Sequence, residues 1–214
     1  MGIKAVIFDF GGVIAFFQDE KDLAGMAAAA GVDAAPFKKW YWETRCLYDQ
    51  GTLSPPEYFD AVIRGAKGGP AGTERENPEN ISAALLDRLV KMDVKSWARI
   101  NPETERLIRD LKNNGYKTGI LSNMIQPFVD WAYVNLPLWT FVDVGLFSCE
   151  AREIKPHAAI YRILLEKCEC AADEVVFFDD MESNVAGAKA LGIRAFLWQG
   201  ADSARHTLTT LVNL

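Results

Sequence analysis

The stretch VIFDFGGVI at residues 6–14 decides the fold. It carries a short, continuous apolar run that leads directly into Asp9 and then into two glycines. A run that is apolar at every position is typical of a strand buried on both faces of a parallel sheet. Two later runs have the same character and two more are weaker candidates: Thr118–Leu121, Val175–Phe178, Val142–Phe147 and Arg194–Trp198.

Amphipathic helical stretches alternate with these runs from residue 101 to residue 214. The expected helices are Asn101 to Gly115, Pro156 to about Cys168, and Asn184 to Leu191. Such alternation predicts an α/β fold with a doubly wound, parallel, Rossmann-like sheet.

The segment 15–100 breaks this alternation, because its patterned stretches are all helical. These stretches are residues 21–30, 37–48, 56–63 and 81–92. We therefore expect a core domain made of 1–14 and 101–214, with an inserted α-helical cap domain at 15–100.

The composition excludes several classes of function. Among 214 residues, 23 are basic and 29 acidic, and this net charge of −6 argues against a nucleic-acid partner. The four cysteines form no CxxC pair, and no apolar stretch reaches the length of a membrane span or resembles a signal peptide. We expect a reduced, cytoplasmic protein with no membrane partner, as a monomer or weak homodimer.

Polar residues follow the predicted strands, where the carboxyl ends of a parallel sheet bind ligands. They are Asp9, the pair Ser122–Asn123, the pair Asp179–Asp180 with Asn184 after it, and Lys155 before a helix. Each of them alone is an ordinary turn or cap residue. Together, three carboxylates without a neighbouring histidine or cysteine ligand favour Mg²⁺, and a lysine and a hydroxyl beside such an ion suit a phosphoryl group.

Four ordered motifs resemble those of the haloacid dehalogenase-like hydrolase superfamily: VIFDFGGVI (6–14), GILSN (119–123), KPHAAIY (155–161) and VFFDDMESNVAGAKALGI (176–193). The insertion lies where the helical-cap branch carries its cap. The cap segment 45–62 and the DDxxxN ending are most similar to glucose-1-phosphate phosphatases. The resemblance implies a Mg²⁺-dependent phosphatase of small phosphorylated metabolites, such as sugar phosphates, that works through an aspartyl-phosphate.

The resemblance also implies a role for each residue of the motifs. Asp9 is the expected nucleophile. The expected metal ligands are Asp9, the Gly11 carbonyl and Asp180, with Asp179 as a direct or indirect partner and Asn184 supporting metal-bound water.

The same resemblance supplies the expected phosphate contacts, which are Ser122, Asn123, Gly12 and Lys155. Ser122 and Lys155 are also expected to be catalytic, since Lys155 would neutralise developing charge. In the cap, Arg45 and Trp42 are the candidates for contact with the substrate, because arginine suits oxyanions and an aromatic ring can stack on a sugar.

One position departs from the pattern of the superfamily. Gly11 stands where most of its phosphatases have an aspartate that serves as general acid, a function worth about 10²–10⁴ in rate. A substitute acid, for which His157 is one candidate, would have to come from elsewhere. Two alternatives stay open: a metal-independent 2-haloacid dehalogenase, which the pair Asp179–Asp180 disfavours by repulsion, and a catalytically weak phosphate-binding or regulatory protein.

Overall fold

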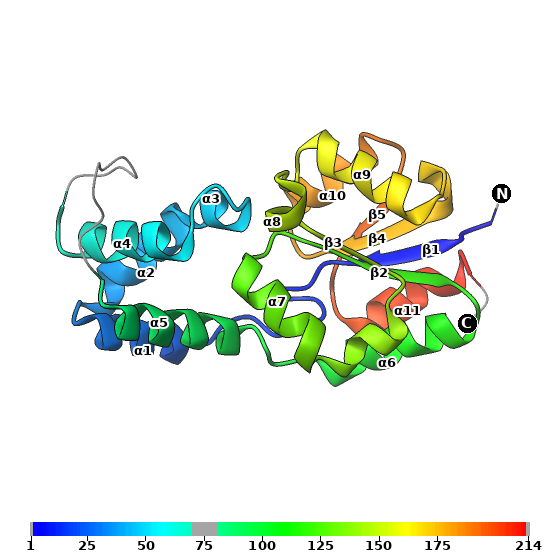
Figure 1. Ribbon diagram of the computed structural model, residues 1–214. Helices are drawn as coiled ribbons and strands as arrows, with labels where there is room; N and C mark the ends of the chain where they lie inside the picture. Colours follow the sequence, from blue (N-terminus) through cyan, green and yellow to red (C-terminus); the bar gives the residue numbers. More distant parts are fainter. Residues whose placement is uncertain (1, 70–80, 213–214) are drawn as a thin grey trace.

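A computed structural model of the chain, shown in Figure 1, describes residues 2–69 and 81–212. Its centre is a five-stranded sheet in the order β3-β2-β1-β4-β5, with every neighbouring pair parallel. The strands are β1 (Ala5–Phe8), β2 (Lys117–Ser122), β3 (Val144–Phe147), β4 (Val175–Asp179) and β5 (Arg194–Leu197). The predicted α/β class with a doubly wound parallel sheet is confirmed, and each predicted strand is present.

The register of the sheet brings the ends of three strands together. Phe8 at the end of β1 lies opposite Ile120 of β2 and Phe178 of β4. The residue that follows β1, Asp9, continues this pairing, because its backbone N–H donates to the Phe178 carbonyl at 2.8 Å. Asp9 and Asp179 therefore emerge side by side at the carboxyl edge.

Helices cover both faces of the sheet (Figure 1). Alternate side chains of β1 point to opposite faces, as the pleat of a strand requires. Val6 and Phe8 belong to one apolar core, with α6 (Pro102–Asn113), α7 (Gln126–Asn135) and α11 (Ala201–Thr209). Ala5 and Ile7 belong to the other, with α9 (Ala158–Cys168) and α10 (Glu182–Lys189). The remaining short elements of this part are η1 (Pro137–Phe141), α8 (Ser148–Ala151) and η2 (Ala172–Glu174).

Helix ends follow the local sequence. The Asn101 side chain accepts from the Glu103 backbone N–H at 3.1 Å and Pro102 stands in the first turn, so α6 begins where predicted. The helix expected at 156 begins two residues later, at Ala158, and the one expected at 184 begins two residues earlier, at Glu182.

In the described residues between β1 and α6, five helices lie to one side of the sheet in Figure 1. They are α1 (Glu20–Ala30), α2 (Ala34–Glu43), α3 (Arg45–Asp49), α4 (Pro55–Ala66) and α5 (Ala83–Ser96). They pack mainly on one another, α2 against α4 and α1 against both α2 and α5. The prediction of a single helical stretch at 37–48 is wrong in one respect, because the helix is interrupted at Thr44 and forms two helices, α2 and α3. This break turns α3 toward the carboxyl edge of the sheet.

Two connecting segments join these helices to the sheet and run side by side. Ala15 pairs with Ile100 in an antiparallel bridge, and Phe16 N–H donates to the Arg99 carbonyl at 2.9 Å. All four cysteines are free thiols. Within residues 2–69 and 81–212, no helix combines the length and apolar character needed to cross a bilayer.

Candidate active site

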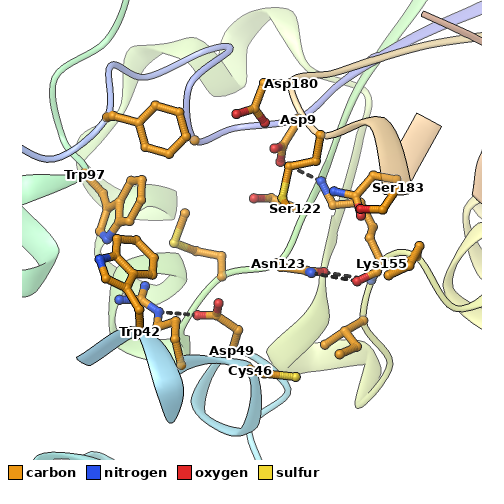
Figure 2. Close-up of a pocket in the computed structure, with 18 residues that line it drawn as sticks. Asp9, Trp42, Cys46, Asp49, Trp97, Ser122, Asn123, Lys155, Asp180 and Ser183 are labelled. Atoms are coloured by element: carbon orange, nitrogen blue, oxygen red, sulfur yellow. Dashed lines mark hydrogen bonds and ion pairs between the residues drawn. The ribbon is translucent and has the colours of Figure 1, made fainter. Parts of the chain in front are cut away.

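A pocket of about 670 Å³ lies at the carboxyl edge of the sheet (Figure 2). Its walls come from the loop after β1, the ends of β2 and β4, the segment before α9, and helices α2 and α3. Every residue assigned from the four motifs lies in or beside this pocket. Of the residues assigned from the motifs, those that line the pocket are Asp9, Gly11, Ser122, Asn123, Lys155, Asp180 and Asn184.

Lys155 is the centre of the site. Its ammonium group lies 2.7 Å from Asp9 Oδ1 and 2.6 Å from Asp179 Oδ2, and it also donates to the Leu121 carbonyl at 3.0 Å. Its side chain is only 1% exposed. Burial raises the pKa of Asp9 to about 6, and Lys155 opposes this rise. Burial also acts to lower the pKa of Lys155, but the two carboxylates outweigh it and raise that pKa.

Asn123 fixes the backbone of Lys155. Its amide donates to the Lys155 carbonyl at 3.0 Å, and its carbonyl oxygen accepts from the Lys155 backbone N–H at 2.9 Å. Asn123 was expected to contact phosphate, and this clamp on Lys155 was not predicted. Nothing in the sequence signals it, because the two residues are 32 positions apart and their pairing depends on the fold.

Asp179 is held in one orientation by its neighbours. Its Oδ1 accepts from the Met181 backbone N–H and from the Asn184 amide, each at 2.9 Å, and its Oδ2 binds Lys155. Asn184 is itself held, because its backbone carbonyl accepts from the Tyr161 hydroxyl at 2.8 Å. Asn184 thus orients a carboxylate directly.

Three carboxylates converge beside Lys155. Asp9, Asp179 and Asp180 each present an oxygen, and these oxygens all lie within 4.8 Å of one another. Asp180 is half-buried, and burial together with Asp179 raises its pKa. Three carboxylates against one ammonium leave a formal charge of −2, which disfavours an anionic substrate. A hard, divalent, oxygen-seeking cation such as Mg²⁺ fits this donor set and would cancel that charge.

The two glycines after Asp9 are required by close neighbours. A Cβ at Gly11 would lie 2.9 Å from Trp97 Cζ3, so the indole occupies the space where a side chain at this position would begin. Gly12 has φ of +76°, and a Cβ there would lie 3.0 Å from Asp180 Oδ2. The Gly12 N–H already donates to the Ala15 carbonyl at 2.8 Å, so it is not free for a phosphate in this conformation.

Helices α2 and α3 supply the opposite wall of the pocket. Trp42 is 42% exposed, and its ring lies against Trp97, edge to face, with centroids 6.4 Å apart. Arg45 also lines the pocket, but its guanidinium is paired: Nε lies 2.6 Å from Asp49 Oδ1 and Nη1 lies 3.4 Å from Asp93 Oδ1. Arg45, an expected candidate for contact with the substrate, thus lines the pocket with its charge already shared by two aspartates.

Two further residues bear on the sequence analysis. Asp49 lines the pocket and was missed, since a lone aspartate on a helix carries no signal. His157 is exposed at the start of α9 and is not among the residues that line the pocket.

Comparison with known proteins places this geometry in a family. The family model of haloacid dehalogenase-like hydrolases matches residues 3–192. A D-ribitol-5-phosphate phosphatase of Bacteroides thetaiotaomicron is 26% identical, over 99% of both chains.

Solved structures share the fold. A HAD family enzyme of Bacteroides thetaiotaomicron, in complex with magnesium and inorganic phosphate, has a TM-score of 0.71 at 20% identity, covering 96% of this chain and 99% of that one. An L-2-haloacid dehalogenase of Xanthobacter autotrophicus has a TM-score of 0.65 at 17% identity, covering 99% of this chain and 85% of that one. The match to the family model spans most of the chain, which therefore belongs to the haloacid dehalogenase-like hydrolases.

Proposed function

We propose that the protein is a Mg²⁺-dependent phosphatase of small phosphorylated metabolites, with Asp9 as its nucleophile. The observation that carries this proposal is the convergence of three carboxylates on one buried lysine in a single pocket. Two comparisons support the proposal. One relative is a D-ribitol-5-phosphate phosphatase, and one protein with the same fold was solved in complex with magnesium and inorganic phosphate.

The nucleophile is prepared by its surroundings. Lys155 and the Phe10 backbone N–H, at 2.7 Å each, both stabilise the ionised form of the Asp9 carboxylate. This carboxylate attacks phosphorus in line, and the bond to the leaving oxygen breaks, which leaves an acyl-phosphate on Asp9. Water then attacks that phosphorus, releases inorganic phosphate and regenerates the Asp9 carboxylate.

Other residues hold the phosphoryl group and the ion. Asp9, Asp179 and Asp180, with the Gly11 carbonyl, would hold Mg²⁺, which supplies positive charge for the phosphoryl oxygens when bound. Ser122 and the Asn123 backbone would donate to those oxygens, and Lys155 would neutralise charge that develops on them.

Helices α1–α5 are proposed to act as a cap over this site. Residues 15–100 are joined to the core through the paired segments at Ala15 and Ile100. In its position over the pocket, such a cap would exclude water and present Trp42 to the substrate. The partner is then a small phosphorylated molecule.

The acidic trio also bears on the alternative reactions. A metal-independent dehalogenase would face its anionic substrate with three carboxylates and one lysine, which is electrostatically unfavourable. The second alternative, a catalytically weak phosphate-binding or regulatory protein, has one observation in its favour, since Trp97 fills the space where a side chain at position 11 would begin. The leaving oxygen would then take its proton from solvent or substrate.

The decisive experiment measures phosphate release from a panel of sugar and nucleoside monophosphates, with Mg²⁺ and with EDTA. Asp9→Asn is the blank, because it keeps the size of the side chain and removes the nucleophile. Release that needs Mg²⁺ and disappears in the variant supports the proposal. Release that persists at full rate in Asp9→Asn overturns it, and halide release from 2-haloacids would favour the dehalogenase.

A further inference from the structure

We propose that Asp49 determines specificity at the far end of the pocket. On this proposal its carboxylate accepts a hydrogen bond from a hydroxyl of substrates whose non-phosphate end is neutral, and it repels substrates that carry a second anionic group there. The inference rests on the proposed phosphatase function and names the class of leaving group, a neutral hydroxylated one.

Asp49 faces the catalytic residues across the pocket. Figure 2 shows it on the side opposite Asp9, at the end of α3, with Lys155 and Trp42 on the walls between. Its side chain is 14% exposed. Its Oδ1 binds Arg45, and among the described residues no hydrogen bond is formed by its Oδ2. One carboxylate oxygen is thus left to accept a hydrogen bond from a ligand.

The position of Asp49 is fixed relative to the phosphate site. Its backbone carbonyl accepts from the Ser148 hydroxyl at 2.5 Å, and the same hydroxyl oxygen accepts from the Met124 backbone N–H at 2.9 Å. Met124 directly follows Asn123, the residue that clamps Lys155. A short chain of hydrogen bonds therefore ties this end of α3 to the loop that binds phosphate, so the distance between the two ends is set.

The charge at this end of the pocket is negative. The single guanidinium of Arg45 is shared between Asp49 and Asp93, and Asp93 is fully buried. One positive charge against two negative charges leaves a formal charge of −1. Arg45 has no unshared charge to offer a second phosphate or a carboxylate, and a like charge placed beside Asp49 is unfavourable.

The walls between the two ends are apolar. Trp42, Trp97 and Met124 line the pocket together with Phe17 and Met181, and of the first three Trp42 is the most exposed. Apolar walls with a few placed polar groups are the usual composition of a site for a small organic ligand. A chain or ring of carbons with hydroxyls at its end matches this arrangement, with its C–H face on the rings and a hydroxyl on Asp49.

A matched pair of substrates tests the proposal. Glucitol 6-phosphate and 6-phosphogluconate differ only at the end away from the phosphate, a hydroxymethyl group in one and a carboxylate in the other. The wild-type kcat/KM is expected to favour glucitol 6-phosphate by at least about tenfold. Asp49→Asn should narrow that ratio at least about fivefold, chiefly by lowering KM for 6-phosphogluconate, and Asp49→Glu should keep it.

Controls separate this proposal from the phosphatase function. Asp87→Asn removes an exposed carboxylate of α5 that is paired with Lys91, and it should leave the ratio unchanged. The same pair of compounds is also titrated by calorimetry into the Asp9→Asn protein with Mg²⁺, so the ratio of Kd values is obtained without turnover.

The outcomes are distinct. No phosphate release from any monophosphate, p-nitrophenyl phosphate included, would refute the phosphatase, and the Kd ratio would still decide on Asp49. A wild-type ratio within about threefold of unity, a ratio that Asp49→Asn leaves unchanged, or no binding of either compound would overturn the role of Asp49.

Discussion

Removing the lysine between the acidic residues is the sharpest test of the site. In Lys155→Met the side chain keeps its length and loses its charge. Asp9 and Asp179, at 2.7 and 2.6 Å from the ammonium, would then be left beside Asp180 with no cation. The formal charge of the group would fall from −2 to −3. The folded state should therefore be strongly destabilised when no Mg²⁺ is present.

The expected loss follows from the burial of these groups. Taking one partner from a buried ion pair costs about 3–5 kcal/mol, because a charge is left uncompensated. For a chain of this size, each 1 kcal/mol lost from the free energy of unfolding lowers Tm by roughly 2–4 °C. The Tm of Lys155→Met should therefore fall by about 6–20 °C.

The loss should also depend on pH. Burial already raises the pKa of Asp9 to about 6, and loss of Lys155 would raise it further. A carboxyl whose pKa is raised in the folded state contributes stability at low pH and loses that contribution as the pH rises through this pKa. The difference in the free energy of unfolding between Lys155→Met and the wild type should therefore be smaller at pH 5 than at pH 8.

The assay is urea and thermal unfolding of both proteins in EDTA and in Mg²⁺. Mg²⁺ should restore part of the stability, because it binds the folded state and supplies the missing charge. Lys91→Met is the matched control: its partner Asp87 is exposed, so a change of no more than about 1 kcal/mol is expected. A loss below about 1 kcal/mol in Lys155→Met would refute the view that this lysine balances a buried acidic cluster.

Three further changes test other parts of the site. Asn123→Ala removes both hydrogen bonds to the Lys155 backbone, so it should lower the free energy of unfolding in urea by about 1–3 kcal/mol and lower kcat. An unchanged kcat would contradict the clamp. Gly11→Asp forces a Cβ to within 2.9 Å of Trp97 and should cost about 1–3 kcal/mol without raising kcat, whereas a faster enzyme would show that the acid can be accommodated. Gly12→Ala, at φ of +76°, should cost about 1–2 kcal/mol and weaken Mg²⁺ activation, measured as the Mg²⁺ concentration for half-maximal rate; wild-type values for both would refute the need for glycine.

Residues whose role depends on local order were predictable. A strand buried on both faces must be apolar throughout, so the runs ending at Asp9 and Asp179 were visible as strands. Parallel strands meet at one edge, so the polar residues that follow them were expected to converge, and they line one pocket. Helix starts such as Asn101 are likewise local, because a cap is formed by residues two or three positions apart.

Contacts between distant segments were decided by the tertiary structure alone. The Asn123–Lys155 clamp, the indole of Trp97 over Gly11 and the sharing of Arg45 by two aspartates all join parts of the chain that no periodicity connects. The sequence does not reveal whether Arg45 is free or paired, because its partners are set by the packing of α3 against neighbouring helices. By itself the sequence determined the strands, the order of the motifs and which polar residues follow the strands at the edge of the sheet, since these depend on local patterns. The packing of the helices then determined the charge and shape of the far side of the pocket, because these depend on which surfaces meet.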